Sequence, residues 1–410
     1  MSEPKLRFKR DDGSDYPEWK YSTLGNVCDS LQYGLNAAAK AFDGQNKYIR
    51  ITDIDESTHK YLMTDLVSPD GPLEEKYSVN IGDILFARTG ASVGKTYLYD
   101  SKDGLLYFAG FLIRAHIKNC YNAGFIYAQT LTKRYGDWVI KTSRRSGQPG
   151  INADELSGFV VQLAISLEEQ QKIADFLSAV DEVIAESEKE VTNLEKQKKS
   201  VMKKIFSQEI RFTRPDGSLF PDWEEKSLSE ICTPLQYGMN TSAKEFDGEN
   251  KYIRITDIDD ITHSYSNSNI VSPSGELDNK YLVREGDILF ARTGASTGKT
   301  YLYKINDGKM FFAGFLIRAH VKDNYNCYFI FSQTLTSEYE KWVKKTSQRS
   351  GQPGINAEEY SSYKMKIPCL EEQKLIADFL SDFDEAIAAA QKELSLWKQL
   401  KKALLQQLFV

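Results

Sequence analysis

The stretch "GDILFARTGASVGKTYLY", residues 82–99, occurs a second time as "GDILFARTGASTGKTYLY", residues 286–303, with one change in eighteen positions. The two copies start 204 residues apart, and "NKYIRITDID" repeats unchanged at the same offset, at residues 46–55 and 250–259. This period is too long for a solenoid repeat and has the size of a domain. The sequence therefore predicts that the chain contains one domain twice.

The first part of each copy is rich in short β-branched and aromatic runs. In the first copy "KYIRIT", "DILFAR", "TYLY" and "FLIRAHI" are typical of strands, and "FIYAQTLTKRYGDWVIKT" is typical of helices. Gly, Asn and Asp separate these runs, as expected for turns. The patterns predict a mixed α/β globular domain at residues 1–166 and a homologous one at residues 208–369.

A heptad pattern follows each globular domain. Residues 168–206 contain no Gly or Pro, and apolar residues recur there at alternating steps of four and three, as in a coiled coil. We expect two long spacer helices, at residues 167–207 and 370–410; the alternative is an amphipathic helix that packs on its own domain. The predicted seam residues are Ile173, Leu177, Val180, Ile184, Leu194, Ile376, Leu380, Phe383, Ile387, Leu394 and Trp397.

The two helical segments have matching seams, including a lysine at the same heptad layer of each, Lys198 and Lys401. Matching seams favour antiparallel pairing, which would place the two domains at opposite ends of the helices, related by a pseudo-two-fold axis. The second domain follows a helix end, "KKIFSQEIRF", whereas no helix precedes the first domain. We therefore expect the C-terminal residues to lie near Lys5 and to give the chain a circular arrangement.

The bulk composition limits the class of protein. The 410 residues carry a net charge of −6, and the five cysteines include no C-x-x-C pair, which argues against a disulfide framework and a zinc site. The sequence has no run of eighteen apolar residues and no apolar N-terminal signal. We expect a cytoplasmic protein without a membrane span, in which any nucleic-acid binding depends on local basic patches.

The repeated loop resembles a nucleotide-binding loop but departs from it. A Walker A loop has the spacing G-x4-G-K-[ST] between a strand and a helix. Here only three residues separate Gly90 from Gly94, and the strand-like "YLY" follows Thr96. We interpret the loop as a glycine turn between strands; the alternative is a nucleotide-hydrolysing enzyme. The four histidines form two repeated pairs without partners at metal-ligand spacing, so we predict no catalytic residue and no metal site.

Two further motifs carry a resemblance to a known family. "GDIL-x-x-R-x-G" ends a strand in each copy, and each domain is followed by a related helix start, "LEEQQKIADFLSAVDEVI" at residues 167–184 and "LEEQKLIADFLSDFDEAI" at residues 370–387. With the duplicated plan, this resembles the specificity subunit of a type I restriction–modification enzyme. The resemblance covers essentially the whole chain.

The resemblance implies a function and a set of partners. In such a subunit each globular domain is a target-recognition domain that reads one half of a split sequence in double-stranded DNA. The helices set the gap between the halves and dock two methyltransferase subunits. Those subunits carry S-adenosylmethionine and methylate adenine, and restriction subunits that use ATP and Mg²⁺ translocate and cleave. The chain itself is then a non-catalytic recognition subunit that binds no cofactor.

We also predict which side chains contact DNA. Arginine reads guanine and glutamine reads adenine in the major groove, whereas lysine more often contacts phosphate. The segments "KTSRRSGQPG" and "KKTSQRSGQPG" supply such residues in both copies. The predicted DNA-facing residues there are Arg144, Arg145, Gln148, Gln348, Arg349 and Gln352, and the predicted phosphate contacts are Arg88, Lys95, Arg292 and Lys299.

The similarity of the two copies predicts the form of the target. Two nearly identical domains related by a two-fold axis would read inverted repeats around a nonspecific gap. The change from Arg144 to Gln348, and from "AAAKAF" to "TSAKEF", allows the halves to differ at one base. The remaining alternative is a scaffold whose duplicated domains bind protein or glycan instead of DNA.

Overall fold

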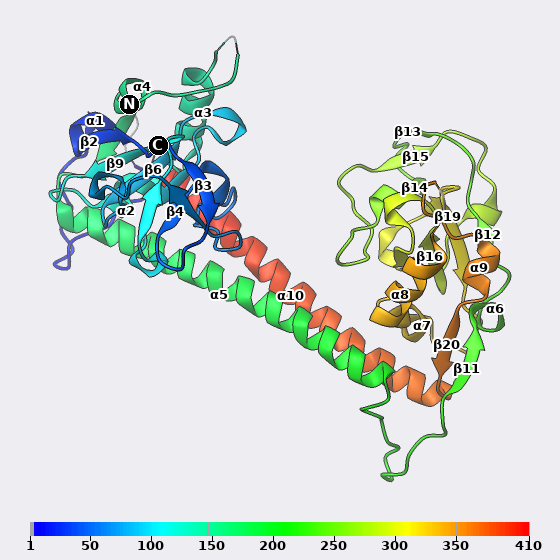
Figure 1. The fold of residues 1–410 in the computed structure, drawn as a ribbon. Coiled ribbons are helices and arrows are strands. Elements are labelled where there is room, and N and C mark those ends of the chain that lie inside the picture. Colours follow the sequence, from blue (N-terminus) through cyan, green and yellow to red (C-terminus); the bar gives the residue numbers. More distant parts are fainter. Residues whose placement is uncertain (1–3, 146, 349–350, 410) are drawn as a thin grey trace. The chain divides into compact units, whose positions relative to one another are not determined.

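The computed structural model describes residues 4–145, 147–348 and 351–409 (Figure 1). The chain forms two compact units: unit 1 contains Met1–Lys189 and Gln391–Val410, and unit 2 contains Glu190–Ala390. Each unit therefore holds one globular domain and a part of each long helix. The two units are described separately below.

Unit 1 is built from ten strands, four short helices and four 3₁₀ turns in its described residues, together with parts of the long helices. The strands are β1 (Lys20–Thr23), β2 (Cys28–Tyr33), β3 (Ala38–Ala41), β4 (Lys47–Ile49), β5 (Val67–Asp70), β6 (Asp83–Ala87), β7 (Thr96–Leu98), β8 (Leu106–Phe108), β9 (Leu112–Ile117) and β10 (Val160–Leu163). The helices are α1 (Leu24–Val27), α2 (Ala123–Gln129), α3 (Lys133–Thr142), α4 (Ala153–Ser157) and α5 (Leu167–Phe206), and the turns are η1 (Ile51–Asp53), η2 (Glu75–Tyr77), η3 (Gly90–Ser92) and η4 (Ser101–Asp103).

Unit 2 repeats this order of elements. Its strands are β11 (Glu224–Ser227), β12 (Gln236–Tyr237), β13 (Ala243–Glu245), β14 (Lys251–Ile253), β15 (Val271–Pro273), β16 (Asp287–Ala291), β17 (Thr300–Leu302), β18 (Met310–Phe312), β19 (Leu316–His320) and β20 (Lys364–Ile367). Its helices are α6 (Leu228–Ile231), α7 (Cys327–Gln333), α8 (Ser337–Thr346), α9 (Ala357–Ser361) and α10 (Leu370–Leu408), and its turns are η5 (Ile255–Asp257), η6 (Asn279–Tyr281), η7 (Gly294–Ser296) and η8 (Ile305–Asp307).

A four-stranded antiparallel sheet, in the order β2–β9–β6–β7, forms the centre of unit 1. All five residues of β6 are buried, because successive side chains of a strand point to opposite faces and both faces are covered. Ile84 and Phe86 join one core with α2 and α3, whereas Leu85 and Ala87 join a second core with β4 and β8. In unit 2 the sheet β12–β19–β16–β17 has the same two cores. The predicted mixed α/β class is confirmed.

Each globular domain begins and ends in one two-stranded ribbon. In unit 1, β1 pairs antiparallel with β10, so that Lys20 lies opposite Leu163. In unit 2, β11 pairs with β20, so that Glu224 lies opposite Ile367. The first and last strands of each domain are therefore neighbours.

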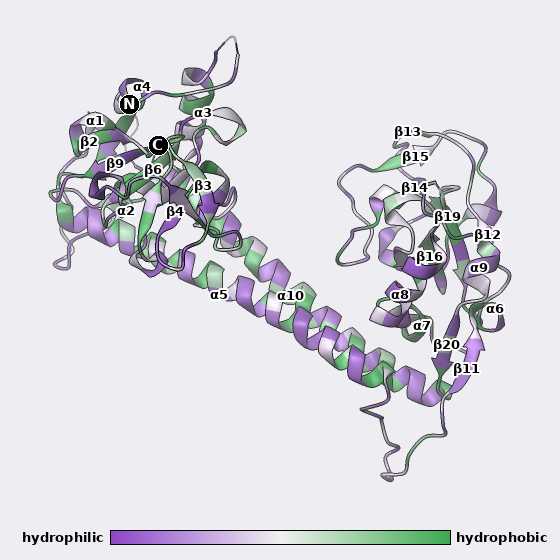
Figure 2. Cartoon of the chain, viewed as in Figure 1, coloured by the Kyte–Doolittle hydropathy of each residue, from purple (hydrophilic) through white to green (hydrophobic). Residues whose placement is uncertain are grey.

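The long helices contact each other with opposite chain directions, as the seams predicted. In unit 1, Ile173 and Leu177 near the start of α5 share one core with Leu408 near the end of α10. In unit 2, Ile205 near the end of α5 shares a core with Ile376 near the start of α10. Figure 2 shows hydrophobic residues recurring along both helices. Among the other predicted seam residues Val180, Ile184 and Leu380 are buried, and Leu194, Phe383, Ile387, Leu394 and Trp397 are half-buried.

The two seam lysines each form an ion pair with the other helix. In unit 1 the Nζ of Lys401 lies 2.5 Å from an Oδ of Asp181, and in unit 2 the Nζ of Lys198 lies 2.5 Å from an Oδ of Asp384. The hydroxyl of Tyr328 donates to the other oxygen of Asp384. A polar residue at a seam position is costly to bury alone but contributes to the choice of register when it is paired.

The beginning and the end of the described chain meet in unit 1. The amides of Lys5 and Leu6 donate to the carbonyl of Gln407 over 2.9 and 3.1 Å, and the ring of Phe409 lies against Trp19 and Phe125, at centroid distances of 6.0 and 5.4 Å. Unit 2 has the same contact within continuous chain, because the amide of Ile210 donates to the carbonyl of Lys204 over 3.1 Å and the ring of Phe206 lies against Trp223 and Phe329. The predicted circular arrangement is thus confirmed, although Val410 itself lies outside the described residues.

The meeting of the chain ends predicts that a circular permutant folds. A chain opened between Ser207 and Gln208, with Val410 joined to Met1 by a short Gly-Ser linker, keeps every contact of both cores. We expect its thermal unfolding midpoint to lie within about 5 °C of that of the natural order, measured by circular dichroism. As a control, a permutant opened between Leu85 and Phe86 cuts a buried strand and should not fold. Failure of the first permutant to unfold cooperatively would contradict the circular arrangement.

Candidate nucleic-acid interface

The repeated glycine loop is a turn between two antiparallel strands. It joins β6 to β7, and its 3₁₀ turn η3 is closed by bonds from the amide of Ala87 to the carbonyl of Lys95 and from the amide of Gly94 to the carbonyl of Ala87, both 2.8 Å long. Gly90 and Gly94 have φ angles of 68° and 87°, which explains the choice of glycine at both positions. A phosphate-binding loop leads from a strand into a helix instead, so the predicted glycine turn is confirmed.

The space over this loop is filled by the chain itself. A Cβ atom placed on Gly94 would lie 2.6 Å from Cγ1 of Val139 in α3, and a Cβ atom on Gly90 would lie 2.8 Å from Nε2 of Gln148. In unit 2 the corresponding distances are 2.4 Å from Gly298 to Val343 and 2.9 Å from Gly294 to Gln352. The glycines therefore allow α3 and the segment after it to pack closely, and the loop leaves no cradle for a nucleotide.

An arginine at the end of β6 is held on a tyrosine ring. The Nε of Arg88 donates to the carbonyl of Gly110 over 3.0 Å, and its Cζ lies 4.8 Å from the ring centroid of Tyr33. The hydroxyl of Tyr33 accepts a hydrogen bond of 3.0 Å from the amide of Ala153, the first residue of α4. These contacts fix the ring and the guanidinium plane together.

Unit 2 repeats this arrangement closely. The Nε of Arg292 donates to the carbonyl of Gly314 over 2.9 Å, and its Cζ lies 5.0 Å from the ring centroid of Tyr237. The hydroxyl of Tyr237 accepts from the amide of Ala357 over 3.0 Å. The same pair of side chains is therefore presented by both domains.

An exposed phenylalanine lies beside the arginine. The amide of Arg88 donates to the carbonyl of Phe111 over 3.0 Å, which continues the pairing of β6 with β9 by one residue. The strand alternation places their side chains on the face that also carries Tyr33. Phe111 is 58% exposed, and its counterpart Phe315 is 57% exposed. The same large apolar side chain is therefore exposed at the same place in both domains.

The segment after α3 completes this surface. The amide of Ile151 donates to the carbonyl of Arg88 over 2.9 Å, and the amide of Gly90 donates to the carbonyl of Pro149 over 2.9 Å. These bonds hold the exposed residue Gln148 beside the arginine. We name the group Tyr33, Arg88, Phe111 and Gln148 the recognition patch of unit 1, and the group Tyr237, Arg292, Phe315 and Gln352 the recognition patch of unit 2.

The recognition patch joins residues that the sequence had placed in different roles. Arg88 and Gln148 were predicted as a phosphate contact and a base contact, and the structure brings them together. Tyr33 and Phe111 were not predicted. The unchanged repeat "FAGFLIRAH" contained a signal for Phe111, because a phenylalanine directly after a glycine turn falls outside the buried alternation of β9.

The other DNA contacts predicted in the segments after α3 and α8 do not belong to the recognition patches. The Nη2 of Arg145 donates to both carboxylate oxygens of Glu155, over 2.6 and 2.7 Å, and its Nη1 donates to two backbone carbonyls. Arg144 and Gln348 are exposed. Arg349 lies outside the described residues. Arg145 is therefore engaged inside unit 1, and its predicted base contact stays a prediction.

The two predicted phosphate-binding lysines are largely covered. The Nζ of Lys299 donates to the carbonyl of Ile258 over 2.9 Å and lies 2.5 Å from an Oδ of Asp260, and its side chain is 10% exposed. The Nζ of Lys95 lies 3.6 Å from an Oε of Glu56, and its side chain is 19% exposed. Both lysines connect a neighbouring loop to the glycine turn, and their predicted phosphate contacts stay predictions.

The four histidines are also hydrogen-bonded within their units. Nδ1 of His59 lies 3.0 Å from the carbonyl of Thr96, and burial lowers the pKa of His59, so the neutral ring donates this bond. His263 has the same contact with Thr300 in unit 2. His116 and His320 lie 2.7 and 2.8 Å from the buried carboxylates of Asp83 and Asp287. Among the described residues no group of three His, Cys, Asp or Glu side chains is arranged to hold a metal ion.

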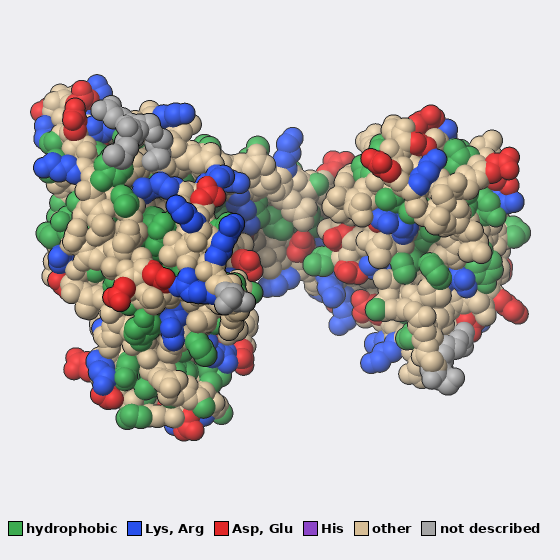
Figure 3. All heavy atoms as spheres, turned by 90° about the horizontal axis from the view of Figure 1, so that it is seen from above, with side chains coloured by type: hydrophobic (Ala, Val, Ile, Leu, Met, Phe, Trp, Pro, Cys, Tyr) green, Lys and Arg blue, Asp and Glu red, His purple; other side chains and the backbone are tan. Residues whose placement is uncertain are grey.

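The charge on the surface is mixed. Figure 3 shows one face, on which several Lys and Arg side chains gather with Asp and Glu among them.

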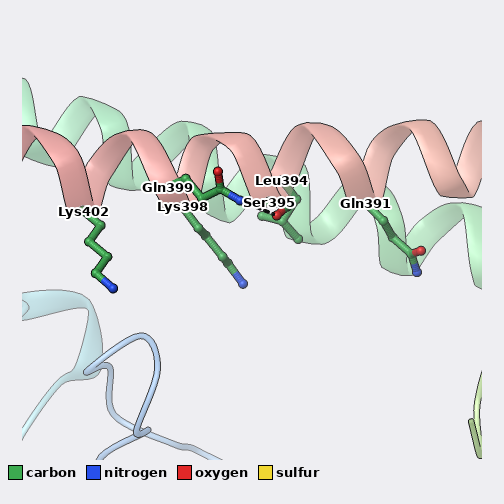
Figure 4. A pocket seen from close by; sticks show the side chains of 6 residues that line it. All are labelled: Gln391, Leu394, Ser395, Lys398, Gln399 and Lys402. Carbon is green, nitrogen blue, oxygen red and sulfur yellow. Dashed lines mark hydrogen bonds between the residues drawn. The ribbon is translucent and has the colours of Figure 1, made fainter. Parts of the chain in front are cut away.

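An open hollow of about 430 Å³ lies on α10, lined by Gln391, Leu394, Ser395, Lys398, Gln399 and Lys402 (Figure 4). The hollow is wide open to solvent, whereas the sites that hold cofactors are enclosed. In the part of the chain that the structure describes, no helix is both long and apolar enough to cross a membrane.

Comparison with known proteins gives the family. The sequence profile of the type I restriction modification DNA specificity domain matches residues 16–196 and 221–396, once in each copy and over more than half of the chain. The chain belongs to this family. The family predicted from the repeated motifs is therefore confirmed, and the chain is a specificity subunit that recognises the DNA target of a type I restriction–modification system. Catalysis resides in the partner subunits of the complex.

Two relatives from Methanocaldococcus jannaschii match over nearly their full length. The putative type I restriction enzyme MjaX specificity subunit is 26% identical over 420 residues, and the type I restriction enzyme MjaVIII specificity subunit is 25% identical over 423 residues. Each match covers 97% of this chain and 94% of the relative.

Two solved structures have a similar fold. The type I restriction–modification S subunit from M. genitalium superposes with a TM-score of 0.61 at 15% identity, over 100% of this chain and 99% of that chain. A chain from a study of complex assembly and conformational transition of the type I R-M system gives a TM-score of 0.57 at 18% identity, over 96% and 98% of the two chains. Both agree with the architecture described above.

The packing over the glycine turn predicts the effect of one added methyl group. Gly94→Ala introduces a Cβ atom against Val139 at a positive φ angle, so we expect the free energy of unfolding of unit 1 to fall by about 2 kcal/mol or more. Gly136→Ala is the matched control, because Gly136 lies in α3 with no atom within 4 Å of the new Cβ. We expect that control to raise stability by about 0.5–1 kcal/mol. Urea unfolding measures both, and equal effects would contradict the packing.

Proposed function

We propose that each globular domain reads one half of a bipartite DNA target and that the long helices set the gap between the halves. The proposed target-recognition domains are residues 1–166 and 208–369, and the proposed spacer helices are residues 167–207 and 370–410. Two methyltransferase subunits dock on the helices and carry S-adenosylmethionine. Restriction subunits, when present, supply the steps that use ATP and Mg²⁺.

The observation that supports this proposal best is the duplication of the recognition patch. An arginine stacked on tyrosine, an exposed phenylalanine and a glutamine occur in both domains with the same contacts. Arginine, glutamine and apolar side chains are the groups that read base edges in the major groove. The filled space over the glycine turn argues against the nucleotide-hydrolysing alternative.

The helices support a target made of inverted repeats. Unit 1 combines the start of α5 with the end of α10, and unit 2 combines the start of α10 with the end of α5. The two units therefore have the same contacts with the roles of the helices exchanged. We propose that the two domains read the same half-site on opposite strands.

The patch itself is the same in both copies, but a neighbouring ribbon differs. In unit 2 the hydroxyls of Thr241 and Ser242 bond to that of Ser274, over 3.1 and 2.7 Å, at the ribbon of β13 and β15. Unit 1 has Ala37, Ala38 and Asp70 at these positions. We propose that any difference between the half-sites arises here or at the Arg144 and Gln348 positions.

The partners expected on the helices explain an apolar feature of α10. Leu396 and Leu400 are 56% and 44% exposed on this helix, one turn apart, whereas α5 has Asn193 and Gln197 at the equivalent positions. An exposed apolar pair on a helix surface is typical of a protein contact. We propose that a methyltransferase subunit covers this part of α10.

Methylation mapping tests the proposed function. The chain is co-expressed with its methyltransferase subunit, and N6-methyladenine is mapped across the host genome, with the methyltransferase alone as the control. We expect chain-dependent methylation at a split palindrome with one fixed gap. Clearly unlike half-sites would contradict the inverted repeat, and methylation that does not depend on this chain would contradict the proposed function.

A further inference from the structure

We infer that Arg88 and Arg292 each read one guanine, through paired hydrogen bonds in the major groove. The sequence alone predicted phosphate contacts for both arginines, and the structure favours a different role. The inference rests on the proposed function, because it requires DNA to lie on the recognition patches. It specifies the base that each domain requires at one position.

The guanidinium group of Arg88 is held by two contacts and has free donors. Its Nε donates to the carbonyl of Gly110, and its Cζ lies over the ring of Tyr33, 4.8 Å from the centroid. None of the described residues accepts a hydrogen bond from its two Nη atoms, and the side chain is half-buried. The donors that remain are those that form the paired bonds to O6 and N7 of guanine.

The platform beneath the arginine is fixed as well. The hydroxyl of Tyr33 is anchored by the amide of Ala153, so the side chain cannot move away from the arginine without breaking that bond. A free arginine side chain loses conformational entropy when it binds, whereas one already held on a ring loses less. A held donor pair also discriminates better, because it cannot shift to follow a wrong base.

The neighbours of Arg88 favour a base rather than a phosphate. Phe111 is 58% exposed beside it, and an apolar ring gains little against a charged backbone but can contact a thymine methyl group. Gln148 offers an amide, the group that reads adenine. The nearby lysine, Lys95, is turned towards Glu56. The patch thus has the composition of a base-reading surface, with its strongest donor at the centre.

Both domains hold this arginine in the same way. The distance from Nε to the glycine carbonyl is 3.0 Å in unit 1 and 2.9 Å in unit 2, and the distance from Cζ to the tyrosine ring is 4.8 and 5.0 Å. The bond from the α4 or α9 amide to the tyrosine hydroxyl is 3.0 Å long in each. The same guanine is therefore expected in both half-sites.

Substitution in one domain at a time tests this inference, because the unchanged domain serves as an internal control. The complex of the full chain with its methyltransferase subunits is prepared with Arg88→Lys and with Arg292→Lys. Methylation is measured on a library in which every base of both half-sites is randomised, at several salt concentrations. Lysine keeps the charge but cannot form the paired, planar contact.

We expect Arg88→Lys to lower the preference for guanine at one position of one half-site by roughly 5- to 150-fold, with other positions unchanged. Arg292→Lys should give the same change at the matching position of the other half-site. Arg10→Lys is the matched control, since Arg10 also stacks on a tyrosine, Tyr16, with its Cζ 5.2 Å from the ring centroid, in the arm that precedes β1. It should leave every base preference unchanged.

A phosphate contact would give a different result. Arg88→Ala would then weaken methylation of all sequences alike and reduce the salt dependence by about one counterion. Unaltered base preference in Arg88→Lys, or a uniform loss over all library members, overturns the guanine assignment while leaving the proposed function intact. Absence of chain-dependent methylation with the unmodified chain overturns the proposed function and this inference together.

Discussion

The architecture depends on one packing arrangement, in which each long helix starts on one core and ends in the other. Leu405 and Leu408 of α10 and the following residue, Phe409, are buried in the core of unit 1, and Met202 and Ile205 of α5 are buried in the core of unit 2. Burial of such side chains is worth about 1.5–3 kcal/mol each. The core of unit 1 therefore contains the end of α10, which begins in unit 2, and the core of unit 2 contains the end of α5, which begins in unit 1.

The recognition patch and the long helices are connected through one core in each unit. In unit 1 the face of the sheet that carries Arg88 packs on the core that also contains residues of α5 and α10. Unit 2 repeats this with Arg292. A surface built on a sheet that packs against a helix keeps its orientation relative to that helix.

The sequence predicted the helices well and the patch poorly, for physical reasons. A heptad pattern is local, so the seam from Ile173 to Ile184 and the antiparallel direction of the helices could be derived from spacing. The meeting of the chain ends could be derived from the comparison of the two copies. The patch depends on strand register and loop packing, which bring Tyr33, Arg88 and Phe111 together from three separate strands or turns. Periodicity contains no information on which strands are neighbours.

The surroundings of two other predicted contacts could not be derived for the same reason. Arg145 pairs with Glu155 in the folded domain. Lys299 pairs with Asp260, which comes 39 residues earlier in the chain, and only the folded loop brings the two together. The DNA contacts predicted for both residues stay predictions. The surroundings of a charged residue in a basic segment become clear only when its acidic partner in the folded chain is known.

The ribbon that joins the first and last strands of each domain has a consequence for how such proteins change. Lys20 lies opposite Leu163, and Glu224 lies opposite Ile367. The residues between the two terminal strands of each domain therefore begin and end side by side. A segment of foreign sequence with the same two terminal strands would fit there without altering the lengths of α5 and α10. Exchange of such a segment can then change the surface of a domain, while both long helices stay as they are.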